Sequence, residues 1–206
     1  MIVTFLVKSF LTLFVVIDPI GLAPIFIILA NDRTSEERLT IARQAVLFAA
    51  LILLVFSLIG PALLRYLEIS LDAFQVAAGI LLFKIAIDMV FTQPEQNNPS
   101  VAEENPSQPD ITVFPLAIPL IAGPGTLASI VILVGESENY LSGLLMVLAV
   151  TAVVLAIAYG ILHLSDYLAQ ILGKAGIDVI TRVLGVLLTA LAVQYIANGA
   201  MGLLQG

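Results

Sequence analysis

The chain has 206 residues, of which 60% are hydrophobic and 11% are charged, and it contains no cysteine. Soluble domains are about 45–50% apolar and about a quarter charged, so this composition indicates a membrane protein with several spans. The missing cysteine excludes disulfides, thiolate metal sites and cysteine nucleophiles. The formal net charge of −7 comes without a basic cluster, so we expect no nucleic-acid partner.

Six apolar stretches are long enough to cross a bilayer, which takes about 20 residues. They cover residues 2–30, 41–64, 71–91, 112–134, 141–163 and 180–204. The first is longer than one crossing needs, which is typical of a broken or tilted helix. No basic region precedes it, so we expect a retained span and not a cleaved signal. The predicted fold is an all-α membrane protein with six transmembrane helices.

A polar, proline-rich stretch divides the spans into two groups of three. We predict a first three-helix repeat at 1–91, a linker at 92–111 and a second repeat at 112–206. Lysine and arginine are enriched in cytoplasmic loops, and most of them fall on one side of this topology. This bias predicts both termini outside and the linker inside. The basic residues on the inner side are Arg33, Arg38, Arg43, Lys174 and Arg182, which leaves Lys8 and Arg65 toward the outer side.

The two groups of spans share a weak internal repeat. At an offset of 105, Pro19 aligns with Pro124, and at an offset of 106, Gly79 aligns with Gly185. An odd number of spans in each repeat inverts the second copy, so we predict two inverted three-helix repeats. The alternative is a coincidental similarity between apolar helices.

Proline and glycine interrupt the first and fourth spans near their middles. The first break comprises residues 18–21 and Pro24, and the second comprises Pro119 and residues 123–125. Proline removes a backbone donor, and glycine weakens a helix. Unsatisfied backbone groups cost several kcal/mol each in lipid, so broken helices persist where they face protein or a water-lined cavity. Breaks at corresponding positions of two halves therefore predict a substrate site between them.

The two breaks differ in the residue that opens the following helix. Asp18 is expected at the N-cap with Pro19 at the first helical position, and Gly123 and Pro124 take the equivalent places. The free N–H groups after Gly123, helped by the Thr126 hydroxyl, would bind a substrate carboxylate. Asp18 would hold an ammonium group or a coupling cation. This pair of poles predicts a small zwitterionic solute such as an amino acid.

The candidate substrate-binding residues are thus those of the two breaks, and each also has a structural interpretation. Asp18 can serve as a plain helix cap, the prolines as packing kinks, and the glycines as points of close helix contact. The full set is Asp18, Pro19, Gly21, Pro24, Pro119, Gly123, Pro124, Gly125 and Thr126.

Two further charged residues lie within the third span. Lys84 and Asp88 are one helical turn apart, and with Asp18 they are the candidates for coupling or gating. Alternatively, Lys84 and Asp88 pair with each other at the membrane surface. Nucleotide-binding, serine-hydrolase and zinc-protease motifs are absent, and there is one histidine. We therefore expect no enzyme, no catalytic or metal-binding residue, no cofactor, and coupling to a H⁺ or Na⁺ gradient.

The break motifs resemble those of the MarC family of bacterial inner-membrane proteins. The resemblance rests on the segments 18–24 and 114–126, and on Arg182 and Gly185 in a T-R-x-x-G context. It implies a six-span protein of the cytoplasmic membrane, related to ion-driven carriers of neutral amino acids such as glycine and alanine. The leading hypothesis is therefore such a transporter, working by alternating access. The competing hypotheses are a non-transporting scaffold or regulatory protein and an exporter or channel for another small solute, and a homo-oligomer is left open.

Overall fold

The computed structural model describes residues 2–91, 111–137 and 139–205, and these ranges are helical apart from their connections. Four helices fit the predicted spans closely or extend them: α3 (Ser35–Tyr66), α4 (Leu71–Phe91), α6 (Tyr140–His163) and α7 (Ser165–Gln205). The first and fourth stretches each form two segments, which are α1 (Ile2–Ile17) with α2 (Pro19–Leu29), and η1 (Thr112–Ile121) with α5 (Pro124–Gly135).

The number of membrane spans agrees with the prediction. Within the described residues, five helical stretches are long and apolar enough to cross a membrane. The number rises to six if η1 and α5, which meet at a bend of 49°, count as one span. The chain is thus an all-helical, multi-pass membrane protein.

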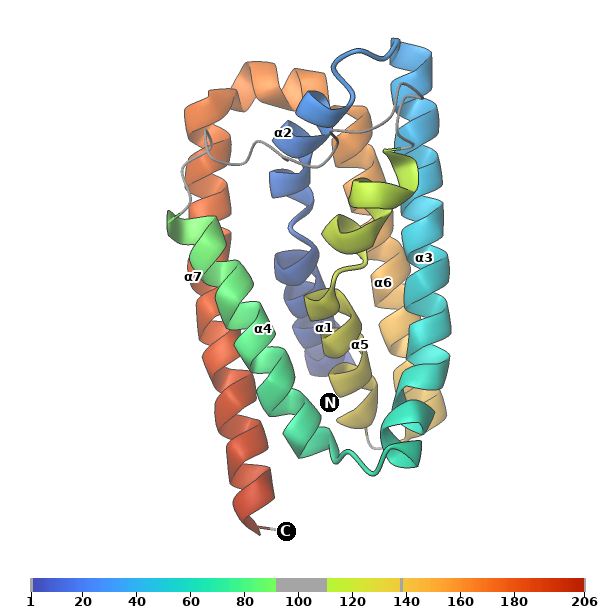
Figure 1. Ribbon diagram of the computed structural model, residues 1–206, viewed down its shortest axis with the longest axis vertical. Helices are drawn as coiled ribbons and strands as arrows, with labels where there is room; N and C mark the ends of the chain where they lie inside the picture. The colour runs from blue at the N-terminus through green and yellow to red at the C-terminus, as the bar shows by residue number, and fades with distance from the viewer. Residues whose placement is uncertain (1, 92–110, 138, 206) are drawn as a thin grey trace, which may run out of the picture.

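The helices alternate in direction along the long axis of the molecule (Figure 1). α1 and α2 rise from the N-terminus, α3 returns and α4 rises again, after which η1 and α5 descend, α6 rises and α7 descends. The chain therefore begins and finishes at one end, here called the terminal end, and the other is the opposite end. The α1–α2 segment and the η1–α5 segment run in opposite directions.

The two interrupted segments lie at the centre of the bundle. α4 packs along α7 on one side, and α3 packs along α6 on the other (Figure 1). α3 contacts both parts of the second interrupted segment, η1 and α5, and α6 contacts both parts of the first, α1 and α2. In the same way, α4 contacts α5 and α7 contacts α2. The long helices α3 and α4 therefore have counterparts, α6 and α7, with matching neighbours in the other half of the chain.

Two connections are more helical than the sequence pattern predicts. The charged loop expected at 31–40 is cut short, because Thr34 and Glu37 form a capping box that starts α3 at Ser35. Glu37 accepts from the Thr34 backbone N–H at 2.8 Å, and Thr34 accepts from the Glu37 N–H at 3.3 Å. α7 likewise begins at Ser165 and is interrupted at Gly173, whose φ of 63° suits a glycine. The linker predicted at 92–111 lies outside the described residues except for Ile111.

The outer faces of the bundle are apolar, as expected for helices surrounded by lipid. Large apolar side chains are exposed along the long helices, for example Leu51 and Ile59 of α3, Ile80 of α4, and Val186 of α7. The buried core in turn gathers around the central segments, where Ile17, Phe26, Ile121 and Ile130 are almost fully enclosed.

Candidate functional site

The first break is a single residue wide. Asp18 has a φ of 47° and a ψ of 63°, in the left-handed region that aspartate tolerates better than most residues. Its backbone N–H donates to Phe14 O at 3.0 Å, and its carbonyl accepts from the Leu22 N–H at 3.1 Å. Hydrogen bonding therefore continues on both sides of the turn, while the helix axis is interrupted.

The Asp18 carboxylate caps the helix that follows it. Its Oδ1 accepts from the Gly21 N–H at 3.1 Å, and Pro19 is the first residue of α2, so the predicted cap is present. A Cβ on Gly21 would collide with the Asp18 Oδ2, which explains why a glycine stands there. Pro24 lies inside α2 and has no N–H, so the Ile20 carbonyl loses its usual helical donor. The first break thus presents a carboxylate and a backbone carbonyl.

The second break is longer and is shaped by its prolines. Phe114 and Ile118 have extended φ and ψ angles inside η1, and each precedes a proline, which disfavours the helical conformation of the residue before it. A Cβ on Gly123 would lie 2.5 Å from the Pro119 carbonyl oxygen, so the chain can turn here only because Gly123 lacks one. Pro119 and Pro124 are exposed, whereas Gly123 and Gly125 are buried.

The N-terminus of α5 has no side-chain cap. Gly123 occupies the N-cap position and Pro124 the first helical position, as the sequence predicts. The first N–H groups of a helix lack intrahelical partners and carry partial positive charge. The Thr126 hydroxyl, by contrast, is engaged, since it is buried and donates to Ile121 O at 3.0 Å. The anion-seeking groups at this break are therefore the backbone N–H groups of residues 125 and 126.

The two breaks lie close to each other in the bundle. A Cβ on Gly125 would lie 3.3 Å from the Val16 side chain, two residues before Asp18, and 2.6 Å from Leu82 of α4. α1 also packs against α5 along its length. A helix start capped by a carboxylate and an uncapped helix start are thus neighbours, near the middle height of the bundle (Figure 1).

Lys84 and Asp88 are not part of this arrangement. Both side chains are exposed on α4, and in the described part of the chain they form no ion pair with each other or with another residue. The two sequence neighbours of Lys84, Phe83 and Ile85, instead pack against the buried core, and Ile85 lies 3.6 Å from the position of a Cβ on Gly125. The structure therefore places Gly125 of the second break beside Val16, next to the first break, and leaves Lys84 and Asp88 exposed on α4.

Sequence reasoning did not single out a polar cluster at the terminal end. Glu136, the residue that ends α5, accepts from Lys8 Nζ of α1 at 2.6 Å and from Gln75 Nε2 of α4 at 3.0 Å. In the sequence, Lys8 is a single cation inside the first apolar stretch, and Glu136 is an acid just after the fourth stretch. A separation of 128 residues leaves no local spacing rule that could pair them.

A second charged contact lies at the opposite end. Arg38 of α3 donates to both carboxylate oxygens of Asp166 in α7 at 3.1 Å. It also donates to Ala30 O at 2.9 Å and to Asn31 O at 3.3 Å, the carbonyls that follow α2. The sequence pattern used Arg38 only to assign the orientation of the protein.

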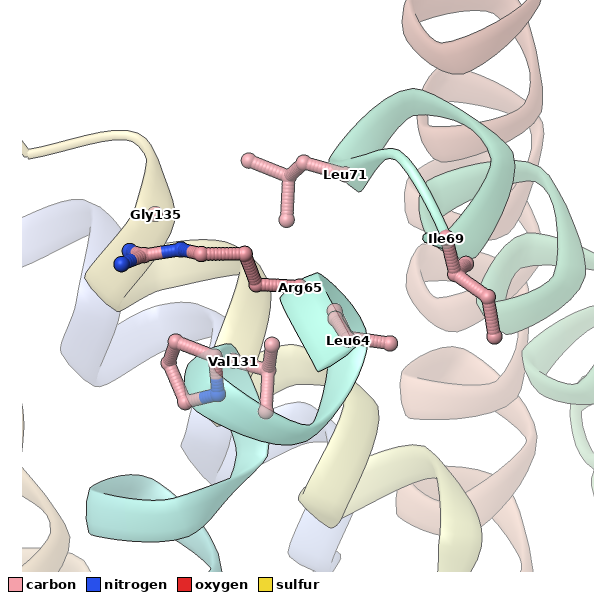
Figure 2. Close-up of a pocket in the computed structure, with 7 residues that line it drawn as sticks. Leu64, Arg65, Ile69, Leu71, Val131 and Gly135 are labelled. Carbon is pink, nitrogen blue, oxygen red and sulfur yellow. The ribbon is translucent and has the colours of Figure 1, made fainter. Parts of the chain in front are cut away.

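A pocket of about 270 Å³ borders the terminal half of α5. Figure 2 shows Leu64 and Arg65 of α3, with Ile69 and Leu71, facing Val131 and Gly135 of α5. Its walls are mostly apolar, and none of the predicted break residues lines it. The pocket is therefore separate from the candidate substrate site.

Comparisons with known proteins agree with the geometry in indicating a membrane protein. The chain is 37% identical over 204 residues to a UPF0056 membrane protein of Methanocaldococcus jannaschii, covering 98% of this chain and 89% of that protein. It is 33% identical to YhcE of Escherichia coli over 203 residues (97% and 93% covered) and 34% identical to YvbG of Bacillus subtilis over 206 residues (98% and 97%). These names describe membrane proteins and state no activity.

No solved structure matches the chain. A family model described as the MarC family integral membrane protein matches residues 3–204, nearly the whole length. The chain belongs to the MarC family of integral membrane proteins.

Proposed function

We propose that this protein is a secondary transporter of small neutral amino acids, such as glycine and alanine, with its substrate site between the two breaks. The observation that carries the proposal is the contrast between two adjacent helix starts. α2 begins at a carboxylate, whereas α5 begins at a glycine and leaves its first N–H groups uncapped. A zwitterion has an ammonium group that suits the carboxylate and a carboxylate that suits the N–H groups.

In this proposal each pole has a separate role. The backbone N–H groups at the start of α5 bind the substrate carboxylate, with the local charge and hydrogen bonds that helix N-termini give to anions. Asp18 holds the substrate ammonium group or a coupling H⁺ or Na⁺, because its Oδ2 is not used by the cap.

Alternating access follows if the halves at 1–91 and 112–206 are inverted repeats. Reciprocal contacts between α4 and α7 support this relation. A Cβ on Gly79 would lie 2.7 Å from Ala192 O and 2.6 Å from Ile196, and one on Gly185 would lie 3.4 Å from Ala86 O and 2.9 Å from Val90. Subtracting 106 from 185, 192 and 196 gives 79, 86 and 90, so each contact has its counterpart on the other helix.

The positions of the basic residues support a cytoplasmic-membrane orientation with both termini outside. Arg33, Arg38 and Arg43 lie around the connection from α2 to α3, at the opposite end of the bundle (Figure 1). Lys8 and Arg65 lie toward the terminal end, and Lys8 is paired with an acid. Under the rule that cytoplasmic loops are rich in lysine and arginine, the opposite end faces the cytoplasm.

Uptake by the purified protein in lipid vesicles tests the proposal. We expect labelled glycine or alanine to accumulate under an imposed proton or sodium gradient, and Asp18→Asn to abolish this while the protein remains folded. An absence of gradient-dependent flux across a broad amino acid panel would overturn the substrate assignment. Unitary conductance steps in a planar bilayer would instead identify a channel, and full activity of Asp18→Asn would remove Asp18 from the site.

A further inference from the structure

The two half-helices that follow the breaks are both fastened at their far ends by charged side chains. The fastening of α5 is formed by Lys8, Gln75 and Glu136, and we call it the terminal latch. The fastening of α2 is formed by Arg38 with Asp166 and the carbonyls of Ala30 and Asn31, and we call it the opposite latch. Each latch joins the first half of the chain to the second.

The two latches contact equivalent positions of the internal repeat. Adding 105 to 31 gives 136, so Asn31 and Glu136 hold the same place after their half-helices. Ala30 is the C-cap residue of α2, and Glu136 is the C-cap residue of α5. In both cases a cation from another helix donates to an oxygen of the residue at this place, which is the Asn31 carbonyl in one half and the Glu136 carboxylate in the other.

The latches face opposite ends of the molecule. α2 rises from its break toward the opposite end, and α5 descends from its break toward the terminal end (Figure 1). Each half-helix therefore lies between the candidate substrate site and one face of the protein. Movement of α5 away from α1 and α4 would open a path to the terminal face, and movement of α2 away from α6 and α7 would open one to the other face.

α5 also has space beside it. The pocket of about 270 Å³ lies against Val131 and Gly135 on the side of α3, just before Glu136 in the sequence (Figure 2). Lys8 and Gln75 hold the end of α5 from α1 and α4. Release of the terminal latch would therefore free this end of α5 next to an existing pocket.

Building on the proposed function, we propose that the terminal latch and the opposite latch are the two gates of the transport cycle. The latch residues act as positioning residues, because they contact no substrate and determine the face to which the site can open. They are Lys8, Gln75, Glu136, Arg38 and Asp166. In the described structure both latches are formed. Transport requires each latch to open in turn.

Side-specific labelling of a single cysteine tests this proposal, and the chain is suited to it because it has no cysteine of its own. We would place the reporter at Val16→Cys, beside Gly125, and apply a membrane-impermeant thiol reagent to vesicles with the protein in one orientation. Lys8→Ala should raise the labelling rate several-fold from the terminal face only, and Arg38→Ala should raise it several-fold from the opposite face only. Arg43→Ala, which removes an exposed cation of α3, should change neither rate.

Two further variants guard against a merely structural effect. The exchange Lys8→Glu with Glu136→Lys restores the ion pair and should return labelling to the slow rate of the reporter protein. Asp166→Asn keeps the Arg38 contacts to Ala30 and Asn31 and serves if Arg38→Ala does not fold. Unchanged labelling, or an equal increase from both faces, would overturn the assignment of the latches as gates.

The labelling experiment separates this proposal from the proposed function, since labelling needs no substrate. Side-specific labelling without amino acid uptake would retain the gates and overturn the substrate. Uptake with labelling that the latch substitutions do not change would retain the transporter and overturn the gates.

Discussion

The two breaks in this protein turn the chain at equivalent positions but stabilise the turn by different means. At the first break a side chain stabilises the turn, since Asp18 adopts a left-handed conformation and caps α2 with its carboxylate. At the second break the backbone does so, since Gly123 approaches the Pro119 carbonyl and no side chain caps α5. One helix start therefore carries a carboxylate, and the other carries N–H groups without a side-chain cap.

If the two halves are inverted repeats, as proposed above, this difference would make the site between them polarised. A symmetric pair of capped helices would present two carboxylates, and a symmetric pair of uncapped helices would present two anion sites. Neither pair suits a molecule that carries both charges. Under the proposed function, the aspartate of one half and the glycine of the other would distinguish the two ends of a zwitterion.

The largest effect is expected at the backbone-stabilised break. In Gly123→Ala the new Cβ would lie 2.5 Å from the Pro119 carbonyl oxygen, which cannot rotate away as a side chain would. We expect a loss of about 1–3 kcal/mol in unfolding free energy, the usual cost of overpacking. Thermal unfolding in detergent measures it. Gly160→Ala in α6 is the matched control, because a Cβ there meets nothing within 4 Å.

The Gly123→Asp variant sharpens the same comparison. It has the steric cost of Gly123→Ala and adds a carboxylate that makes the second pole like the first. If the α5 N–H groups bind the substrate carboxylate, Gly123→Asp should lose glycine binding beyond any loss seen in Gly123→Ala. Equal ligand-induced thermal shifts for the two variants would contradict this role.

The next effect concerns the symmetric part of the scaffold, where α4 and α7 meet. Gly79→Ala would place a Cβ 2.7 Å from the Ala192 carbonyl oxygen, whereas the nearest backbone oxygen to a Cβ in Gly185→Ala is 3.4 Å away. Alanine also favours a helix over glycine by about 1 kcal/mol, which offsets part of each cost. Gly79→Ala should therefore lower the unfolding temperature more than Gly185→Ala. The reverse order would show that the approach to the Ala192 carbonyl does not determine the cost of Gly79→Ala.

A smaller effect is expected at the side-chain-stabilised break. Asp18→Ala removes the cap of α2 and should cost about 1 kcal/mol, whereas Asp18→Asn keeps an acceptor and should cost less. Gly21→Ala should resemble Asp18→Ala, because its Cβ would displace the carboxylate from the capping position. Unfolding measurements rank the three variants. A Gly21→Ala protein as stable as the unaltered chain would show that the cap contributes little.

The sequence predicted the break geometry well because local rules determine it. Aspartate or glycine before a proline favours the start of a helix, so Asp18 and Gly123 could be assigned as N-caps without a structure. The start of α3 was wrong by six residues, since hydropathy was given more weight than the Thr34 and Glu37 capping box. The sequence contains the capping residues of all three helices, but the prediction used only Asp18 and Gly123.

The latches could not be predicted in the same way. Lys8 and Glu136 are 128 residues apart, as are Arg38 and Asp166, and their pairing depends on how the two halves pack. No periodicity or motif brings such residues together. Arg38 and Lys8 could be counted as charges from the sequence, but their partners follow only from the tertiary arrangement.

The smallest effect on stability is expected at Lys84 and Asp88, the charged pair in the third span. They occupy one face of α4, yet both side chains are exposed and, within the described residues, no ion pair joins them. Substitutions that break no packing and no buried contact usually change stability little, so Lys84→Ala and Asp88→Asn should unfold at nearly the same temperature as the unaltered protein. Their value lies in uptake assays, where a loss of gradient coupling without a loss of stability would assign them to coupling or gating. Unchanged uptake in both variants would leave Asp18 as the coupling candidate, and would confine the functional asymmetry of the molecule to its two breaks.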